Sequence, residues 1–507
     1  MEKLSNIKPE EAYFYNKLSK KTQMFSCFSD TKFLNRLSHT KIVVDVCKDI
    51  YSNLPHKNVN LDRLLMSAKL HDIGHTPFGH AGEETINDLF IKIDNSHYSA
   101  TYPGLFKHNL NSIRILSEKY EFQENDYVLL DSILKHTSTC PKNYNFDIFS
   151  ESNILKFNYI FVKNNFVKSD FLQKFYEIYE NKKCKKRTEI PVNGRKFCYS
   201  CKNKEICYFS KDNKISDLEK LSCYLSYPYP LTTEGSILLW SDEISCLIGD
   251  LKDLFYYLIK FEEDVDTFVP FSSLRLCYLR LSACFKNNIL VSYFCDYFEL
   301  IKNNFNIESK LENCSKILQK IKTELISKLT LISKKKFIDV VFKRGGCSPR
   351  IILDKETHII FKEIKDSIYK DIHSISIIKQ NNQDGSKKIR SLIEYYIAHI
   401  NYFITDYEKI YKNSELIKKL SIAISNVLNI RKSTEFGTTH YLMKQLKKKS
   451  FSIESEYLCN LEFIKDKIKS KQKNNAVKNL FKREIGYFVA SLDEEQINNL
   501  YKNYISS

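Results

Sequence analysis

The sequence predicts an all-α, mostly helical fold, and three features lead to this prediction. The 507 residues include only 12 Gly and 10 Pro, so few positions interrupt regular structure. Apolar residues recur over long stretches at the three- and four-residue spacing of amphipathic helices. A hydrophobic content of 43% and an aromatic content of 13% are typical of a folded chain and argue against disorder. At this length we expect one large core or two to three cooperating units.

The net charge of +17 is compatible with two interpretations. A lysine-rich surface is often merely solvated, but it also attracts phosphate on a nucleotide or on a nucleic acid backbone. Residues 1–15 lack the apolar segment of a secretory signal, and no apolar run approaches the roughly 20 residues of a membrane span. The 15 Cys are then most simply reduced thiols. We therefore expect a cytoplasmic protein without membrane contact.

Arg36 to Tyr51 is expected to form the first long helix, marked by Leu37, Val43, Val44, Cys47 and Ile50. His39 lies one turn from Arg36, so the two side chains can point the same way. A single histidine here is more often structural than functional. His39 becomes a candidate ligand because a second predicted helix carries His71 and Asp72 near its end.

This second helix is expected from Asn58 to Gly74, with Leu61, Leu64, Leu65 and Ala68 as its apolar stripe. The next inward position is Asp72, and a buried carboxylate costs several kcal/mol unless it is paired or bound to a metal. A turn rich in Gly and Pro follows and carries His75 and His80. The histidines and carboxylates of residues 61–83 therefore indicate a metal and phosphate site.

Further helices are expected at 81–93, from 111 and at 127–136, followed by an insertion at 137–229 with weak periodicity. The insertion contains one CxxC pair with two more cysteines nearby, Cys184, Cys198, Cys201 and Cys207. These four could hold a structural zinc ion, although their spacing is irregular and free thiols are the simpler interpretation. The predicted division is therefore 1–136, the insertion 137–229, a helix-bearing segment 230–264 and a helical C-terminal region 265–507.

Residues 230–257 return to a clear helical pattern with an acidic strip that includes Asp242, Asp250 and Asp253. Such a strip is commonly a solvated face, but here it could supply a carboxylate to the histidine-rich helices. Long helices are expected beyond it, among them 311–336 and 389–411, with the polar run Asn381 to Ser386 as a surface loop. We find no glycine-rich phosphate loop and no repeat of fixed period.

Several segments, in this order along the first half of the chain, resemble the HD-domain metal-dependent phosphohydrolases, and within them the deoxyguanosine triphosphate triphosphohydrolases. The matching segments are KTQMF at 21–25, NRLSHT at 35–40, HDIGHTPFGHAGE at 71–83, FKHNLNSIRIL at 106–116, ILKH at 133–136 and SDEISCLIGDLKD at 241–253. An HD pair alone is a weak signal, whereas the long central segment with its flanking pieces is specific. IGYFVASLDEEQINNLY near the C-terminus resembles a family segment more weakly.

The resemblance implies a helical HD core and roles for individual residues. The metal ligands would be His39, His71, Asp72 and Asp242. The catalytic group would be His108, held by Glu83, with His75 also facing the phosphates. Substrate contacts would come from Gln23, Arg36, His80, Cys246 and Asp250. Two imidazoles and two carboxylates suit one divalent ion such as Mn, Fe, Co, Zn or Mg, with positions left for water and phosphate.

Two positions depart from the family pattern. Cys246 stands where family members usually have a Tyr that packs under the sugar and helps to exclude a 2′ hydroxyl, so weaker selectivity for deoxyribose is expected. Gly486 stands where the C-terminal family segment usually has an Asp, which bears on oligomer or effector contacts.

The leading hypothesis is a metal-dependent enzyme that hydrolyses a deoxynucleoside triphosphate, dGTP by default, to the deoxynucleoside and triphosphate. A second hypothesis keeps the metal centre but uses another nucleotide, such as a monophosphate or a modified nucleotide. A third is a nucleic-acid-binding or regulatory protein with secondary hydrolytic activity, since some relatives bind single-stranded DNA. A homo-oligomer is also expected from the resemblance.

Overall fold

The computed structural model describes residues 2–25, 32–54, 59–94, 106, 108–121, 126–136, 189–192, 195–198, 207–208, 233–261, 272–302, 307–331, 351–411 and 475–506. The N-terminal helices are α1 (Tyr13–Asn16), α2 (Arg36–Asn53), α3 (Leu61–Leu70), α4 (Gly79–Asp94), α5 (His108–Lys119) and α6 (Asp126–Lys135). The later helices are α10 (Thr233–Phe261), α11 (Ser272–Cys284), α12 (Ile289–Lys302), α13 (Ile307–Ser327), α15 (Lys355–Ser374), α16 (Ser376–Ala398), α17 (Ile400–Tyr411), α21 (Asn475–Ser491) and α22 (Glu494–Tyr501). The predicted all-α class is confirmed.

The described strands are short and form three small sheets. β1 (Glu2–Lys3) pairs in parallel with β2 (Tyr120–Glu121), and β6 (Leu329–Leu331) pairs antiparallel with β7 (Ile351–Leu353). Within the predicted insertion, β4 (Arg195–Cys198) lies between β3 (Glu189–Val192) and β5 (Cys207–Tyr208), with antiparallel pairing on both sides. None of the helices in the described part of the chain is long and apolar enough to cross a membrane.

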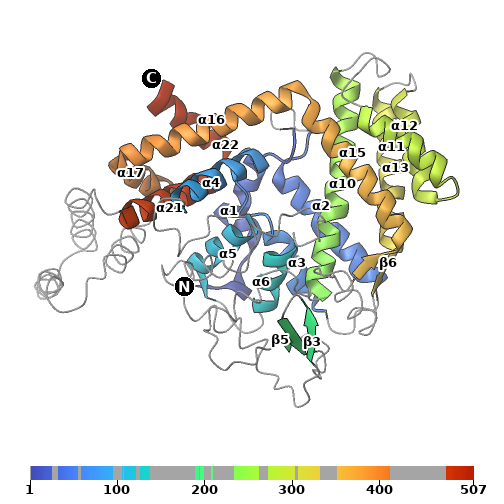
Figure 1. The fold of residues 1–507 in the computed structure, drawn as a ribbon, viewed down its shortest axis with the longest axis horizontal. Coiled ribbons are helices and arrows are strands. Elements are labelled where there is room, and N and C mark those ends of the chain that lie inside the picture. Colours follow the sequence, from blue (N-terminus) through green and yellow to red (C-terminus); the bar gives the residue numbers. More distant parts are fainter. Residues whose placement is uncertain are drawn as a thin grey trace, which may run out of the picture.

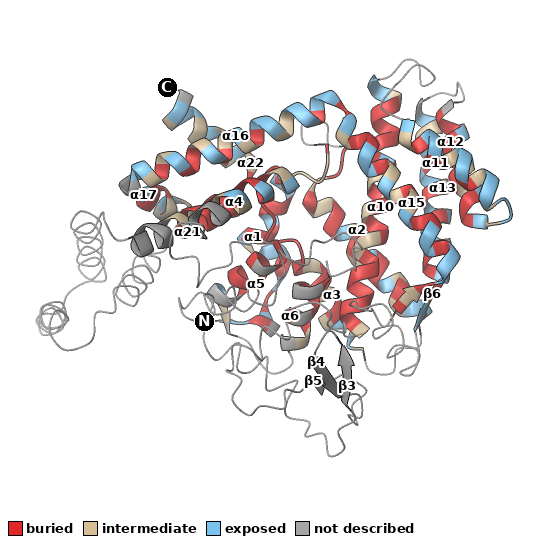
Figure 2. Ribbon diagram, viewed as in Figure 1, coloured by how far each residue is buried: buried red, intermediate tan, exposed pale blue. Residues whose placement is uncertain are grey.

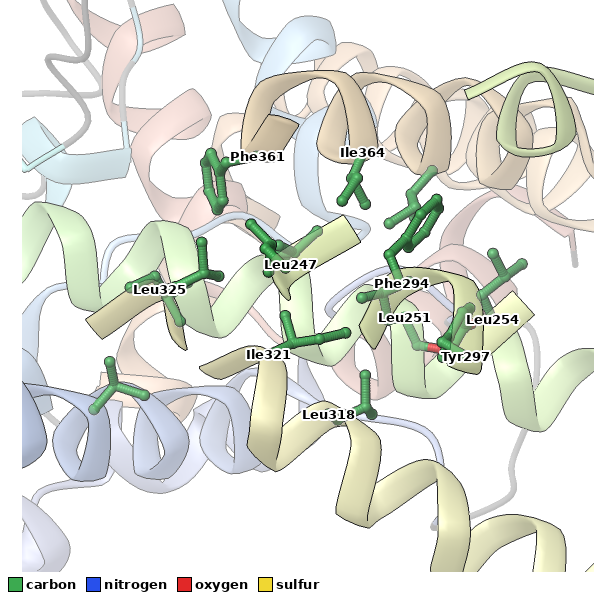
Figure 3. Packing of buried hydrophobic residues seen from close by; sticks show 14 of the residues in the cluster. Leu247, Leu251, Leu254, Phe294, Tyr297, Leu318, Ile321, Leu325, Phe361 and Ile364 are labelled. Carbon is green, nitrogen blue, oxygen red and sulfur yellow. The ribbon is translucent and has the colours of Figure 1, made fainter. Parts of the chain in front are cut away.

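The long helix α10 is the centre of the larger core. α2, α6, α13 and α15 contact it, and α3 packs between α2 and α6 (Figure 1). Figure 3 shows leucines of α10 against Phe294 and Tyr297 of α12, Ile321 of α13 and Phe361 of α15. Figure 2 shows the buried residues along the inward faces of these helices, as the apolar periodicity predicts. The packing of the apolar face of α10 thus fixes which of its polar residues lie next to α2 and α3.

A second core lies under α16. This helix contacts α4, α21 and α22, and all four lie together in Figure 1. Tyr396, Phe403 and Phe488 are fully buried in this core, together with Phe78 from the turn that precedes α4. The last described segment of the chain is therefore packed against the turn that carries the sequence-predicted histidines.

Three expectations about local structure are corrected. Residues 381–386 were expected as a loop but lie inside α16, where Gly385 allows the ring of Phe78 to approach the helix backbone. The expected helix 311–336 ends at Ser327, because Leu329–Leu331 pairs with the β-branched strand Ile351–Leu353. The expected helix 389–411 is interrupted at His399, whose φ of −127° is not helical.

The predicted division into four segments remains a prediction, because most of residues 137–229 lie outside the described residues. The described cores do not follow the boundary at 264, since α12, α13 and α15 share one core with α2 and α10. Of the four cysteines considered for zinc, Cys184 and Cys201 lie outside the described residues. Cys198 and Cys207 are register partners on β4 and β5.

We predict that Gly74→Ala lowers the free energy of unfolding by about 3 kcal/mol, the upper end of the usual cost of overpacking. A Cβ at this position would overlap backbone atoms of His108 and Ser112, which cannot rotate away. Gly79→Ala is the comparison, because its Cβ would lie 3.7 Å from the nearest atoms and only its φ of +55° opposes a side chain. That strain costs about 1 kcal/mol. Urea unfolding of both variants measures the difference, and equal losses would contradict it.

Candidate functional site: a buried histidine–carboxylate centre

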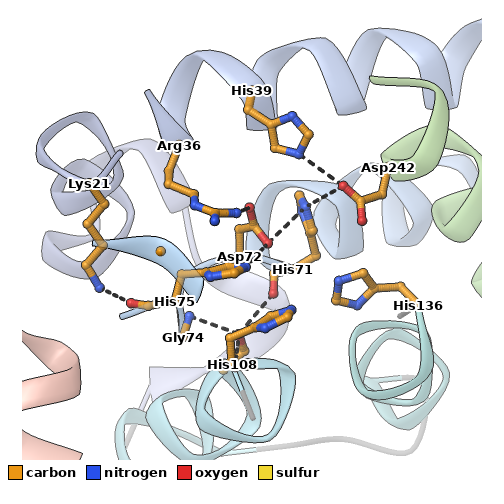
Figure 4. A network of polar contacts seen from close by, with 12 residues as sticks. Lys21, Arg36, His39, His71, Asp72, Gly74, His75, His108, His136 and Asp242 are labelled. Carbon is orange, nitrogen blue, oxygen red and sulfur yellow. Dashed lines mark hydrogen bonds and ion pairs between the residues drawn. The ribbon is translucent and has the colours of Figure 1, made fainter. Parts of the chain in front are cut away.

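The four side chains expected as metal ligands lie together in the structure, as Figure 4 shows. His39 comes from α2, His71 and Asp72 follow the last turn of α3, and Asp242 lies in the N-terminal half of α10. His39 Nε2 is 3.0 Å from Asp242 Oδ1. His71 Nε2 lies 3.3 Å from Asp72 Oδ1 and 3.7 Å from Asp242 Oδ1. One potential ligand atom from each of His39, His71 and Asp72 falls within 4.8 Å of the others.

Local sequence explains why these helices hold their ligands at this place. The side chain of Asn35 accepts from Ser38 N, while Ser38 Oγ accepts from Asn35 N, which is a capping box that starts α2 one turn before His39. Asp253 of α10 accepts hydrogen bonds from Leu34 N at 3.2 Å, immediately before that cap. The entry of α2 is therefore tied to the helix that carries Asp242.

The charges in this centre require a compensating cation. Burial would raise the pKa of Asp72 and Asp242, but the surrounding imidazoles, and Arg36 beside Asp72, hold both pKa values well below the ordinary value. Burial acts to lower the pKa of His71, yet the two carboxylates outweigh it and raise that pKa to about 9. Arg36 supplies one positive charge beside the buried Asp72, and a proton on His71 or a metal ion can supply the other, between Asp72 and the half-buried Asp242.

The donor set fits a divalent metal ion. His71 Nδ1 is 2.7 Å from the Ala68 carbonyl oxygen, so this nitrogen is the donor and Nε2 presents its lone pair to the centre. That Nε2 atom is buried and has no hydrogen-bond partner, as expected of a ligand atom. The described residues contain further candidate His and Asp groups for such an ion.

Asp72 is held on both of its oxygens. Arg36 Nη1 donates to Oδ2 at 3.0 Å, and His75 Nε2 lies 3.2 Å from Oδ1. Arg36 Nε also donates to the Thr22 carbonyl oxygen at 3.1 Å, and the Arg36 and Asp72 side chains are almost fully buried. The structure thus gives Arg36, expected to contact phosphate, a direct role in orienting a candidate ligand.

A second pair of residues lies beside the first. His108 Nδ1 is 2.9 Å from Glu83 Oε2, and the His108 ring stacks on His75 with 3.8 Å between ring centroids. Burial, Arg36 and His108 together lower the pKa of His75 well below its ordinary value, so the His75 ring is neutral. Lys21, itself buried, donates its Nζ to the His75 carbonyl oxygen. These contacts fix the turn in which His75 lies.

The expected substrate contacts are only partly assembled. Gln23 Nε2 lies 3.9 Å from Cys246 Sγ, and that sulfur lies 3.6 Å from Asp242 Oδ1, so Gln23 and Cys246 border the centre. Asp250 is half-buried on α10, about two turns beyond Asp242. His80 is exposed, and its ring centroid is 6.2 Å from that of His75.

His136 belongs to the same centre, although the sequence analysis assigned it no role. Its ring meets that of His71 edge-on, with centroids 5.1 Å apart, and its buried Nε2 has no hydrogen-bond partner. Ligand atoms of His71, His136 and Asp242 lie within 4.8 Å of one another. Burial and the neighbouring His71 lower the pKa of His136 to about 4, so it is neutral. The sequence feature that could have indicated a role for His136 is its position one turn after the buried Ile133, within the segment ILKH.

Comparison with known proteins identifies the fold around this centre. The family model described as "HD domain" matches residues 36–156, which include three of the four candidate ligands. The chain contains an HD domain. The expected family resemblance is thereby confirmed at the level of this domain.

Curated proteins named "Deoxyguanosinetriphosphate triphosphohydrolase-like protein" are similar to about a quarter of this chain. The protein from Pelagibacter ubique is 34% identical over 128 residues, which is 24% of this chain and 31% of the relative. That from Nitrosomonas europaea is 37% identical over 109 residues, 21% of this chain and 26% of the relative. That from Clostridium tetani is 35% identical over 132 residues, 25% and 33% respectively. The matches thus span between a quarter and a third of the length of these relatives.

We predict that Asp253→Asn flattens the pH dependence of stability. Burial raises the pKa of Asp253 from its ordinary value of 3.8 to about 8, so the folded protein keeps a proton there that the unfolded chain releases. Stability from this group is therefore fully present below pH 3.8 and is lost as the pH rises through 8. The amide side chain of the variant would still accept from Leu34 N but would not titrate.

Urea unfolding between pH 4 and pH 8, the interval between the two pKa values of Asp253, measures the effect. Asp45→Asn, at an exposed position of α2, is the matched control. A slope in Asp253→Asn equal to that of the wild type and of the control would show that Asp253 does not titrate in this range.

Proposed function

We propose that this protein is a metal-dependent hydrolase that cleaves a deoxynucleoside triphosphate, dGTP by default, into the deoxynucleoside and inorganic triphosphate. The observation that carries the proposal is the set of contacts in which His39 and His71 approach Asp242 and His71 also approaches Asp72, with the Glu83–His108 pair nearby. The similarity of about a quarter of this chain to proteins named as triphosphohydrolase-like supports the same substrate class.

His39, His71, Asp72 and Asp242 would hold the metal ion, with His136 Nε2 within reach of the same centre. A divalent ion bound there would polarise a phosphoryl oxygen and acidify a bound water molecule. Arg36 keeps Asp72 in place through the 3.0 Å contact and prevents the carboxylate from rotating away. This assignment explains why the buried Asp72 and the half-buried Asp242 both lie against histidine rings.

His108 would handle the proton of the leaving group. Attack of water at the α-phosphorus breaks its bond to the nucleoside 5′ oxygen, which leaves with a developing negative charge that a proton must neutralise. Glu83 accepts from His108 Nδ1, so Nε2 is the nitrogen that carries the proton to be transferred. The neutral ring of His75, stacked on His108, keeps the donor ring in one plane.

The remaining assignments complete the proposal for the substrate. Gln23 would contact the nucleoside and share its 3′ hydroxyl with Asp250, while Cys246 would lie near the sugar. Arg36 and His80 would lie toward the phosphates. Manganese as the working metal and a homo-oligomeric state belong to the same proposal and follow from the family resemblance, and a cytoplasmic location is proposed from the cysteine content. Binding of single-stranded nucleic acid belongs to the alternative hypothesis, in which hydrolysis is secondary.

We predict that the purified protein with Mn releases triphosphate from at least one deoxynucleoside triphosphate. A panel of all dNTPs and NTPs, each with Mn, Mg, Fe and Co, is analysed for product identity. His71→Ala and Asp242→Ala should abolish turnover, because each removes a ligand atom from the centre. Release of diphosphate or monophosphate in place of triphosphate would instead support a different HD phosphohydrolase. Full turnover in either variant would remove the proposed centre.

We predict that His108→Ala lowers the turnover rate at least about a hundredfold, the usual contribution of a positioned acid or base. Its metal content should stay at the wild-type value, since Nδ1 of His108 is engaged by Glu83. Steady-state kinetics and elemental analysis measure the two quantities. The control is His399→Ala, an exposed position at the end of α16. A wild-type rate in His108→Ala would assign the proton donor to another group.

A further inference from the structure

A carboxylate near the C-terminus reaches the candidate site from the far end of the chain. Glu494 is the first residue of α22, which starts at a capping box between Asp493 and Gln496. Glu494 Oε1 accepts from Thr22 N and from Phe78 N, both at 3.0 Å, and Oε2 accepts from Thr22 Oγ1 at 2.7 Å. The Glu494 side chain thus joins two segments that are far apart in the sequence, one containing Thr22 and the other containing Phe78.

The first of these segments leads directly to the candidate ligands. Thr22 stands between Lys21, which donates to the His75 carbonyl oxygen, and Gln23, the proposed nucleoside contact. The Thr22 carbonyl oxygen accepts from Arg36 Nε, and Arg36 in turn holds Asp72. A displacement of Thr22 would therefore reach both the nucleoside contact and a ligand.

The second segment is the turn that carries His75. Phe78 has a φ of +59°, which L residues adopt only at a cost, and Gly79 follows with a φ of +55°. The hydrogen bond from Phe78 N to Glu494 stabilises this conformation. On the other side, the Phe78 ring fits over Gly385 of α16, where a Cβ would lie 2.5 to 2.9 Å from ring and Cβ atoms of Phe78. The turn is thus fixed from the C-terminal region at two points.

We propose that Glu494 is a positioning residue that holds Thr22-Gln23 and the Phe78 turn at a fixed separation, so that α22 completes the nucleotide site. This inference rests on the proposed function for its nucleotide. It assigns a task to the C-terminal segment whose resemblance to the family was weak, and it couples the packing of the second core to the geometry of His75.

Three variants test the role of Glu494, and its neighbour provides the control. Glu494→Ala removes all three hydrogen bonds. Glu494→Gln keeps Oε1 for the two backbone donors, and its amide can donate to the Thr22 hydroxyl, so it should restore most of the function. Thr22→Val removes one of the three bonds. Glu495→Ala is the matched control, since Glu495 makes only an exposed ion pair with Lys20 among the contacts described for it.

The expected result has two parts, measured on the full chain. Glu494→Ala raises KM for dGTP at least about fivefold, well within the loss that misplacement of binding groups can cause. It also speeds hydrogen exchange of the Thr22 and Phe78 amides, measured by mass spectrometry. Glu494→Gln stays near the wild type, Thr22→Val falls between, and Glu495→Ala changes neither quantity.

Two outcomes would overturn the role of Glu494. In the first, exchange and KM in Glu494→Ala match those of Glu495→Ala. In the second, only the melting temperature falls while KM and kcat stay at wild-type values, which would leave Glu494 a purely structural contact. A wild-type protein without turnover would refute the proposed function instead. Amide exchange would then decide the positioning role by itself, with faster exchange confined to Thr22 and Phe78 in its favour.

Discussion

The placement of two carboxylates, one buried and one half-buried, among imidazole rings is the constraint on which the rest of this structure depends. Asp72 and Asp242 approach the same nitrogen of His71, and their charge must be balanced where water has little access. The surrounding contacts serve this purpose: Arg36 engages one oxygen of Asp72, His75 the other, and the Ala68 carbonyl fixes the tautomer of His71. A metal ion would satisfy the same demand and give the centre its chemistry.

Helix packing brings these groups together because the same helices carry apolar residues that pack in the core and polar residues that face the site. α10 buries leucines against α12 and α13 and turns Asp242 toward α2 and α3. α3 does the same on a smaller scale, with Leu64 and Ala68 buried before His71. His39 and Asp242 therefore take their positions from helices of the large core, and His71 and Asp72 from the turn that directly follows α3.

The second core has a different relation to the site. It is built from α4, α16, α17, α21 and α22, and it reaches the centre through Phe78 and Glu494 rather than through a ligand. Phe78 belongs at once to that core and to the turn that holds His75. Phe78 and Glu494 are more than four hundred positions apart in the sequence, yet they share a hydrogen bond. Packing near the C-terminus thereby holds the backbone of the turn next to the candidate catalytic groups.

The sequence by itself determined the helical class, the HD domain and the candidate ligands, because these depend on local periodicity and on short, ordered motifs. It also placed Glu83 with His108, whose contact at 2.9 Å the structure shows. It could not assign His136, since a histidine after an apolar helix is ordinary until its neighbours are known. Only the tertiary structure decided that residues 381–386 are helical and that Glu494 touches Thr22 and Phe78. These features arise from packing between segments distant in the chain, and local patterns do not record such contacts.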